Sequence, residues 1–175
     1  MCQSYNRQYG TDYISVMPTN LYGPNDNFDL ESSHVLPALI RKFHEAKINS
    51  APSVEVWGTG FPKREFMYVD DLADAALHLI NNYSGNDIIN IGVGKDVSIR
   101  ELAEKIKTIV NYQGEVVFNA DKPDGTPRKL VDVTRLNSLG WKASTSLDKG
   151  LEMAYGWFLE NEAQTRENKA VIGVN

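Results

Sequence analysis

Short apolar runs alternate along the chain with longer stretches in which apolar residues recur every three or four positions. The short runs have the length and β-branched content of buried strands, and they span Tyr13 to Met17, Val54 to Trp57, Asp87 to Ile91 and Glu115 to Phe118. The longer stretches have the period of an amphipathic helix. Strands that alternate with helices in this way predict an α/β architecture.

Capping and turn residues predict where the helices begin and end. Ser98 and Glu101 form the sequence pattern of a capping box, which predicts a helix from there to Tyr112. Either Ser32 or Ser33 is the expected N-cap of an earlier helix. The other expected helices are residues 3–9 stopped by Gly10, a helix from about Leu72 to Asn82 capped by Asp70 or Asp71, and two short helices near Val133–Leu139 and Ser146–Glu160.

The helical period also predicts which side of each helix faces the core. A step of 100° per residue places His34 and Arg41 nearly opposite the apolar side of the helix that follows Ser33. That apolar side consists of Val35, Leu36, Leu39, Ile40 and Phe43. In the next helix, the expected core side carries Leu72, Ala75, Ala76, Leu79 and Ile80.

Composition and charge narrow the class of protein. The chain has 175 residues, of which 42% are hydrophobic and 10% aromatic, and such values are typical of a globular protein with a core. The net charge is −5 and no basic run exceeds two residues, which argues against nucleic acid as a partner because neutralising phosphates needs a basic stripe. The single cysteine, Cys2, allows neither an internal disulfide nor a cysteine-based zinc site. No metal site is expected.

Targeting signals are not evident in the sequence. The first ten residues lack the charged-then-apolar pattern of a signal peptide, and no apolar run approaches the length of a membrane span. We therefore expect a cytoplasmic protein that has no membrane partner.

Five motifs resemble the GDP-L-fucose synthase family, which belongs to the extended short-chain dehydrogenases/reductases. They are Pro18-Thr19-Asn20-Leu21-Tyr22-Gly23-Pro24; Ser33-His34-Val35 with Pro37-Ala38-Leu39; Val56-Trp57-Gly58; Arg64-Glu65-Phe66 with Val69-Asp70-Asp71; and Lys122-Pro123-Asp124-Gly125-Thr126-Pro127-Arg128-Lys129. The second and fifth motifs narrow the resemblance to the fucose enzyme, whereas the first and fourth are shared by many nucleotide-sugar epimerases and dehydratases. The resemblance covers nearly all of residues 2–160.

The resemblance implies a fold, a reaction and a cofactor. The implied fold is an incomplete NAD(P)-binding Rossmann fold, residues 1–31 and 70–97, with a small α/β substrate-binding domain, residues 32–69 and 98–163, and a flexible tail, residues 164–175. The implied reaction converts GDP-4-keto-6-deoxy-D-mannose to GDP-L-fucose: C3 and C5 are epimerised through enol intermediates, and NADPH reduces the C4 ketone. The enzyme is then an NADP-dependent oxidoreductase and isomerase, and the full-length parent is expected to be a homodimer.

Several parts that this reaction needs are missing from the sequence. There is no G-x-x-G-x-x-G phosphate loop, no tyrosine is followed by lysine at the fourth place, and Cys2 does not match the family's catalytic cysteine. About four strands are too few for a complete doubly wound nucleotide-binding domain. We therefore interpret the chain as the C-terminal portion of a longer enzyme and expect it to be inactive by itself.

The resemblance assigns catalytic and cofactor-binding roles to five residues. His34 resembles the acid of the epimerisation, a task that suits a side chain exchanging protons near neutral pH, and it also lies beside the cofactor in the family. Pro18, Thr19, Asn20 and Leu21 correspond to the loop after a Rossmann strand that contacts the nicotinamide half of NADP(H). The competing interpretations are a surface histidine at the start of a helix and an ordinary exit from a strand.

The resemblance also assigns five substrate contacts. They are Lys42, Trp57, Arg64, Asp124 and Lys129. Cations suit a diphosphate in an acidic protein, and arginine can bind phosphate oxygens in a fork; Lys63 and Arg41 are alternatives to Arg64. A tryptophan ring can pack against the guanine, the ribose or the sugar. The competing interpretations are solvated surface cations, a tryptophan in the core and an aspartate that only shapes an Asp-Gly turn.

Two other functions are compatible with the sequence. The first is a related epimerase, dehydratase or reductase acting on a UDP- or dTDP-sugar, against which the segment from Lys122 to Lys129 argues. The second is a free-standing, non-catalytic module that binds a nucleotide sugar or a partner. An upstream reading frame that carries the missing motifs would distinguish a fragment of the enzyme from such a module.

Overall fold

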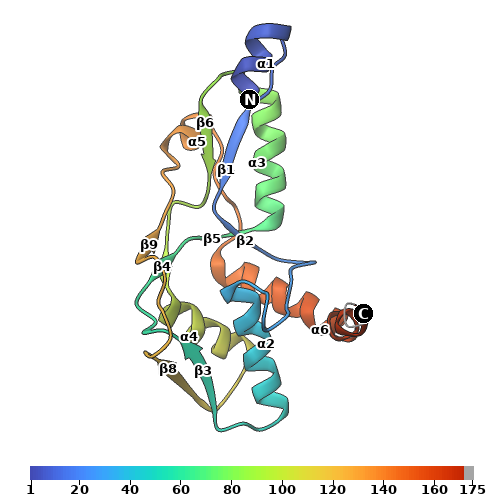
Figure 1. Cartoon of the computed structure of the whole chain (residues 1–175), viewed down its shortest axis with the longest axis vertical. Coiled ribbons are helices and arrows are strands. Elements are labelled where there is room, and N and C mark those ends of the chain that lie inside the picture. The colour runs from blue at the N-terminus through green and yellow to red at the C-terminus, as the bar shows by residue number, and fades with distance from the viewer. Residues whose placement is uncertain (172–175) are drawn as a thin grey trace.

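The computed structural model describes residues 1–171, and it leaves the side chains of residues 162–171 and all of residues 172–175 undescribed. The molecule is elongated and has two parts, which we call the upper part and the lower part after their places in Figure 1. The upper part comprises α1 (Cys2–Tyr9), β1 (Ser15–Pro18), α3 (Val69–Asn82), β6 (Ile88–Ile91) and α5 (Thr134–Ser138). The lower part comprises α2 (Val35–Ile48), β3 (Ser53–Trp57), α4 (Ile99–Val110), β8 (Glu115–Asn119) and α6 (Leu147–Val171).

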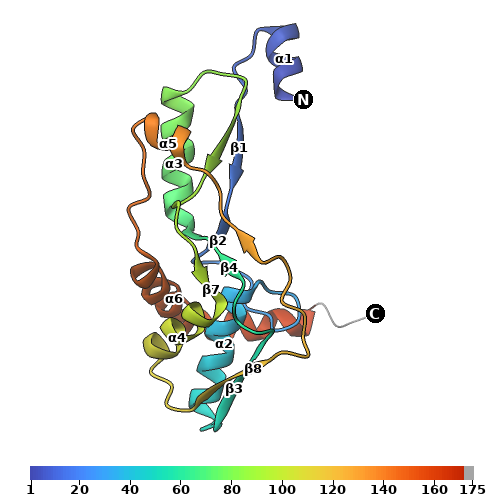
Figure 2. The same ribbon diagram turned by 90° about the vertical axis from the view of Figure 1, so that its left-hand side faces the viewer.

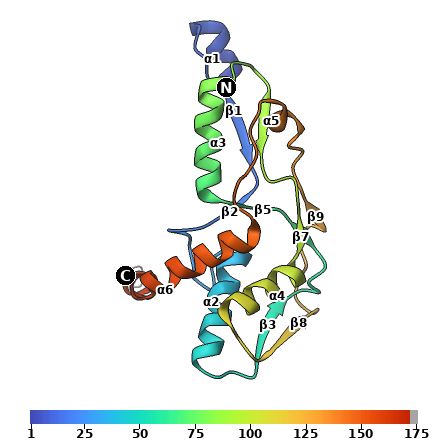
Figure 3. The ribbon, with the colours of Figure 1, turned by 180° about the vertical axis from the view of Figure 1, so that it is seen from behind.

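Two parallel strands form the centre of the upper part. β1 pairs with β6 in a register that runs from Ser15 opposite Ile88 to Pro18 opposite Ile91. Helix α3 lies alongside β1, as the view from behind shows (Figure 3). The buried apolar side chains of this part are Met67, Ala75, Leu79, Ile89, Ile91, Leu136 and Trp141.

The lower part has its own core between helices and a second parallel pair. β3 and β8 pair in parallel from Ser53 opposite Glu115 to Trp57 opposite Asn119. Val54 and Val56 are buried while their neighbours on β3 are exposed, which is the alternation of a strand with one face on a core. Helix α4 packs against both α2 and α6.

Short strands join the two parts where the chain crosses between them (Figure 2). These strands are β2 (Asn20–Tyr22), β4 (Lys63–Arg64), β5 (Phe66–Tyr68), β7 (Val97–Ser98) and β9 (Arg128–Lys129). β2 pairs with β5 in parallel, and β4 lies between β7, which is antiparallel to it, and β9, which is parallel. The sequence patterns did not predict these strands, because two or three residues are too few to show a period.

The α/β architecture expected from the sequence is confirmed. The four predicted strands correspond to β1, β3, β6 and β8, with boundaries shifted by one or two residues. Helix α1 ends at Gly10, which has the left-handed φ of 66° expected of a C-terminal glycine. Both reciprocal bonds of the capping box between Ser98 and Glu101 are present at the start of α4.

The predicted start of α3 is wrong. The helix begins at Val69 with Tyr68 as its N-cap, so neither Asp70 nor Asp71 caps it. The side chain of Asp71 is buried and instead accepts hydrogen bonds from the segment before α6, at Ser144 Oγ (2.8 Å) and at the backbone of the next residue. An aspartate after a strand has the same local pattern whether it caps a helix or binds a distant segment.

Two expectations about exposure are also wrong. Arg41 is only 9% exposed, because its guanidinium bonds to Glu45 one turn along α2 and to the backbone oxygen of Phe28 in the preceding loop. Ile80, expected on the core side of α3, is 68% exposed.

The predicted N-cap of α2 is wrong as well. Helix α2 starts at Val35 with His34 as its N-cap, rather than with either serine before it.

The described residues leave two predictions open. Helix α6 continues to Val171, so the backbone of residues 164–171 is helical. The structure does not describe the side chains of these residues or any part of residues 172–175, and the flexible tail expected for residues 164–175 stays a prediction. The proposed domain boundaries remain a prediction. Within residues 1–171, no helix combines the length and apolarity needed to cross a membrane. Among the side chains that the structure describes, no three from His, Cys, Asp or Glu are grouped so that they could hold a metal ion.

Candidate functional site

The small sheet β7–β4–β9 lies at the junction, the region where the upper and lower parts meet. Its basic residues lie on two opposite faces. Arg64 is the register partner of Lys129 on β9, so these two side chains lie side by side on one face. Lys63 is the partner of Arg128, on the opposite face. Lys63 therefore does not replace Arg64 in a common site, contrary to the alternative that the sequence allowed.

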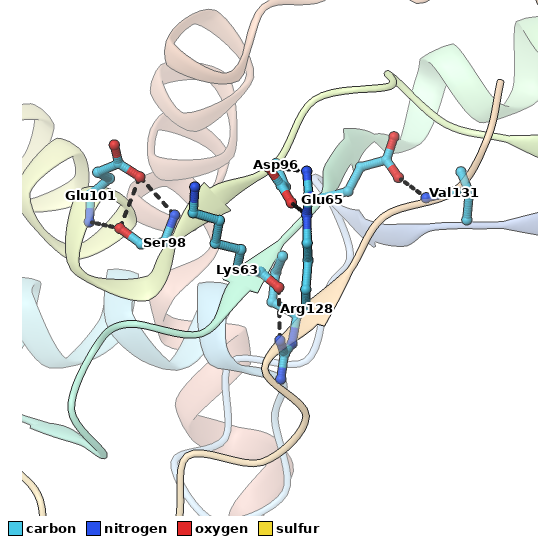
Figure 4. Close-up of polar contacts among 8 residues, drawn as sticks. Lys63, Glu65, Asp96, Ser98, Glu101, Arg128 and Val131 are labelled. Atoms are coloured by element: carbon cyan, nitrogen blue, oxygen red, sulfur yellow. Dashed lines mark hydrogen bonds and ion pairs between the residues drawn. The ribbon is translucent and has the colours of Figure 1, made fainter. Parts of the chain in front are cut away.

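The face with Lys63 carries a network of ion pairs and hydrogen bonds, which Figure 4 shows. Arg128 bonds to the carboxylate of Asp96 through two nitrogens, and the bond from Arg128 lowers the pKa of Asp96. Glu101 accepts bonds from the backbone and the hydroxyl of Ser98, and these bonds lower the pKa of Glu101. On this face Arg128 is paired with Asp96, and Lys63 lies within electrostatic range of Asp96 and Glu101, whereas the face with Arg64 and Lys129 carries two neighbouring cations.

Asp124 connects the exposed loop of residues 121–127 to the end of β3. Its two carboxylate oxygens accept the backbone N–H of Thr59 at 2.6 Å and the Thr59 hydroxyl at 2.7 Å. The next residue, Gly125, lies close to Arg64, since a Cβ added at Gly125 would be 3.6 Å from Nη2 of Arg64. The loop therefore joins Thr59 and Arg64, and Asp124 serves as more than a turn residue.

Trp57 lies at the end of β3 between two lysines. Its ring is 61% exposed, so the interpretation as a core tryptophan is wrong. The ammonium groups of Lys42 and Lys122 lie 5.3 Å and 5.4 Å from the ring centroid, within the range of cation–π attraction. Lys42 also donates to the backbone oxygen of Glu55 at 3.3 Å, and partial burial lowers the pKa of Lys42.

Contacts link the four side chains in series, with Trp57 and Asp124 joined through the backbone from Trp57 to Thr59, and we call these four residues the connected surface. It runs from Lys42 to Trp57, then through the Thr59–Asp124 contact to Gly125 and Arg64. Lys122 extends this surface and was missed as a site residue, although it begins the Lys-Pro-Asp motif. The motif that contains Lys122 was recognised in the sequence, but only the fold shows that the Lys122 ammonium lies near the Trp57 ring.

Arg64 also lines a cavity of about 670 Å³ between the junction and the segment that precedes α6. The volume lies in the range of small-molecule sites. The cavity is further lined by Phe66, the loop of residues 92–97, Lys105 and residues 142–147. Two of its charges are paired: Lys105 bonds to Asp148 at 2.6 Å, and Asp96 bonds to Arg128. Of the predicted site residues, Arg64 alone is among its lining residues.

The predicted cofactor segment is not the loop that the sequence suggested, because Pro18 ends β1 and Asn20 and Leu21 already belong to β2. It does lie at the carboxyl end of the parallel pair β1–β6, the place where ligands sit in open α/β sheets. Thr19 donates its N–H to the backbone oxygen of Ile91 at 2.9 Å. Asn20 Nδ2 donates to the backbone oxygen of Glu65 at 2.7 Å. The Asn20 side chain is thus engaged within the protein, and Leu21 continues into β2.

His34 is exposed at the start of α2. His34 lies within electrostatic range of Asp26, where it opposes the burial that raises the pKa of Asp26. The structure therefore leaves His34 accessible to a ligand, in the position of an N-cap rather than in a pocket.

Comparison with known proteins identifies the family of the chain. Residues 1–92 match the NAD dependent epimerase/dehydratase family. The chain is 56% identical over 175 residues to GDP-L-fucose synthase from Escherichia coli strain K12, covering 95% of the chain and 54% of the relative. It is 59% identical over 160 residues to GDP-L-fucose synthase 1 from Arabidopsis thaliana, covering 91% of the chain and 50% of the relative.

The solved structures give the same picture. A GDP-L-fucose synthetase from Naegleria fowleri, bound to NADP, superposes with a TM-score of 0.88 at 33% identity, covering 94% of this chain and 54% of that one. The chain thus spans about half the length of the relatives that it matches.

Proposed function

The chain belongs to the NAD dependent epimerase/dehydratase family, and on that premise we propose that it is the nucleotide-sugar-binding part of a GDP-L-fucose synthase. The observation that supports this most directly is the pair of adjacent cations, Arg64 and Lys129, on one face of the junction sheet. This pair ends the connected surface that begins with Lys42 and Trp57. The similarity to enzymes named GDP-L-fucose synthase supplies the substrate class.

Each side chain of the connected surface has a distinct part in binding. Arg64 and Lys129 bind the diphosphate, since a guanidinium and an ammonium side by side match two neighbouring phosphate groups. Trp57 offers an exposed ring for packing against the guanine, the ribose or the sugar. Asp124 holds the loop that borders Arg64 in place through its two bonds to Thr59. Lys42 and Lys122 keep the surroundings of the ring cationic.

The residues at the carboxyl end of β1 fit a dinucleotide cofactor. Pro18, Thr19, Asn20 and Leu21 lie where such ligands sit in open α/β sheets, and a related structure from Naegleria fowleri holds NADP. When bound, NADPH supplies the hydride that reduces the C4 ketone of the sugar. His34, accessible at the start of α2, donates a proton to the enolate carbon during epimerisation.

The chain by itself is expected to bind GDP weakly and to give no NADPH oxidation with the keto-sugar. It lacks the glycine-rich phosphate loop and the Tyr-x-x-x-Lys pair. Turnover by a purified sample free of any full-length enzyme would contradict this expectation. The cytoplasmic location, expected because no targeting signal is evident, and the homodimer of the full-length parent, implied by the resemblance, remain predictions.

A nuclear magnetic resonance titration of the ¹⁵N-labelled chain with GDP tests the proposal, because this method detects weak binding residue by residue. The expected result is a set of shifts at the indole N–H of Trp57 and at the amides of Thr59 and Gly125, with UDP giving weaker shifts. Equal shifts with UDP would favour the related UDP-sugar enzyme. No shift at these groups with millimolar GDP would contradict the proposed site.

The sequence of the DNA upstream of the first codon provides a separate test. A continuous reading frame that encodes G-x-x-G-x-x-G and Tyr-x-x-x-Lys is expected. A stop codon and a ribosome-binding site immediately upstream would instead favour a non-catalytic nucleotide-sugar-binding module.

A further inference from the structure

The carboxylate of Glu65 is fully buried at the junction of the upper and lower parts, with 0% of the residue exposed. Its Oε1 accepts the backbone N–H of Val93 at 2.6 Å and that of Gly94 at 2.7 Å. Its Oε2 accepts the backbone N–H of Val131 at 3.0 Å. Figure 4 shows the side chain of Glu65, which lies between β4 and β5, reaching towards Val131. One carboxylate thus connects two segments that are far apart in the sequence.

The main chain of Glu65 connects two further segments. Its N–H donates to the backbone oxygen of Lys129 on β9 at 3.3 Å. Its backbone oxygen accepts Asn20 Nδ2 at 2.7 Å and Thr19 Oγ1 at 3.3 Å. Glu65 is therefore bonded both to the predicted cofactor segment and to the strand that carries Lys129.

Burying the carboxylate of Glu65 lowers the stability of the fold unless other interactions compensate for it. Burial of a charged group is favourable only when hydrogen bonds replace its water shell, and apolar side chains of similar volume often stabilise a fold as well. Here the two oxygens accept three backbone donors that would otherwise be buried without a partner. Buried polar networks of this kind fix one arrangement of the segments that they join.

The arrangement that Glu65 fixes is the one that places the two cations together. Arg64, the last residue of β4, directly precedes Glu65, and Lys129 lies opposite Arg64 and two residues before Val131. Gly92 and Val93, in the loop held by Oε1, line the same cavity as Arg64. The fit is close, because a Cβ added at Gly92 would come within 2.5 Å of Oε1.

We propose that Glu65 is a positioning residue for the diphosphate: its buried carboxylate fixes the loop of residues 92–94 and the exit of β9 so that Arg64 and Lys129 face the ligand together. This inference rests on the function proposed above. Glu65 itself contacts no substrate atom. It acts by fixing the positions of Arg64 and Lys129.

The substitution Glu65→Gln tests the proposal in the purified chain. A glutamine has almost the same shape, but its amide NH₂ must face at least one of the three backbone N–H groups, so one bond is lost. We expect the affinity for GDP, measured by the ¹⁵N titration, to fall about tenfold, which corresponds to one misplaced charge-assisted hydrogen bond. The affinity for guanosine, which has no phosphate, is expected to stay the same. A merely structural role would weaken both ligands alike and would overturn the proposal.

Glu101→Gln is the matched control, because Glu101 is also a carboxylate bonded to a backbone N–H near this sheet but lies outside the proposed site. It should leave both affinities unchanged. A tenfold loss of GDP affinity in this control as well would overturn the assignment to Glu65. A wild-type chain without GDP-induced shifts would contradict the proposed function itself, whereas equal GDP binding by wild-type and Glu65→Gln chains would overturn this inference alone.

A measurement on the wild-type chain keeps the proposal testable even if Glu65→Gln does not fold. A ligand that uses Arg64 and Lys129 together stabilises the arrangement held by Glu65. Saturating GDP should therefore slow hydrogen exchange at the amides of Val93, Gly94 and Val131 as a group. Bound GDP with unchanged exchange at these three amides would show that Glu65 has no such role.

Discussion

At the scale of single residues, the alternation of side chains along β4 decides which cation takes part in the proposed site. Arg64 and Lys63 are neighbours in the sequence and both are basic, yet they lie on opposite faces of the sheet. Arg64 lies beside Lys129, while Lys63 lies beside Arg128, whose charge is paired with Asp96. Two adjacent substitutions can therefore separate a role in binding from a general effect of positive charge.

Arg64→Ala is predicted to weaken GDP binding by about tenfold or more, since hydrogen bonds to charged groups contribute roughly 1.5–3 kcal/mol. Lys63→Ala removes the same charge from the other face and is expected to change the affinity less than twofold. Isothermal calorimetry or the ¹⁵N titration measures both. In a full-length parent, Arg64→Ala should affect GDP-sugar binding more than NADPH binding. A larger effect on the cofactor would show that Arg64 is misassigned.

Trp57→Ala is predicted to weaken GDP binding by about fivefold or more, because stacking of a base on an aromatic ring contributes about 1–3 kcal/mol. Trp57→Phe keeps a ring in the same place and should retain most of the affinity. Both variants should keep the melting temperature of the wild-type chain to within about 2 °C, since an exposed side chain contributes little to the core. An equal loss of affinity in the two variants would contradict stacking.

At the scale of elements, the capping box at the start of α4 is the local feature that the sequence predicted most directly. Glu101 and Ser98 satisfy each other's backbone N–H groups, which would otherwise be without partners in the first turn. The apolar side of this helix contributes Leu102, Ala103 and Ile106 to the lower core. Loss of the cap therefore affects the stability of the helix that supports the junction sheet.

Ser98→Ala is predicted to lower the free energy of unfolding by about 1 kcal/mol, the usual effect of removing a capping side chain. Urea unfolding followed by circular dichroism measures the change. Thr108→Ala, in the last turn of the same helix and exposed, is the control and should have a smaller effect. If the two variants unfolded at the same urea concentration, the cap would contribute nothing.

The same cap predicts a dependence of stability on pH. The folded state lowers the pKa of Glu101, so its contribution is present above the ordinary glutamate pKa of about 4.3 and is lost as the pH falls through the lower folded value. The difference in unfolding free energy between the wild type and Glu101→Gln should be constant from about pH 5 to pH 7 and shrink below about pH 4. A difference that grows as the pH falls would contradict this sign.

At the scale of the whole molecule, the upper part exposes apolar side chains that a complete α/β domain would bury. They are Tyr5, Tyr9, Tyr13, Val16, Met17, Leu77, Ile80 and Ile88. Parallel sheets are normally covered on both faces, whereas here two strands have α3 beside them and β1 pairs with β6 alone. The wrong expectation for Ile80 has the same origin, because helical period predicts an apolar face but not which neighbour covers it.

Self-association of the purified chain is the expected consequence, since large exposed apolar patches drive association. Ile80→Glu, on the outer side of α3, should reduce the self-associated fraction in analytical ultracentrifugation. Ile48→Glu changes another exposed isoleucine, at the end of α2 in the lower part, and should leave that fraction unchanged. A monomeric wild-type chain, or equal effects of the two variants, would contradict this prediction.

The sequence by itself determined the alternation of strands and helices, the capping box and the family. These features are local: a period, a cap and a motif each depend on a few neighbouring residues. The motifs at Asn20, Arg64 and Asp124 are among those that indicated the family, and the comparisons confirm the family. The roles assigned to single site residues remain predictions.

The tertiary structure alone decided which residues meet. The register of β4 with β9 set Arg64 beside Lys129 and Lys63 away from it, and two-residue strands carry no period from which this could be predicted. Asp71 and Glu65 bind backbone groups more than 25 residues away, so no local pattern distinguishes them from a cap or a surface charge. Contacts between distant segments depend on how the whole chain closes, and the sequence of one segment does not contain that information.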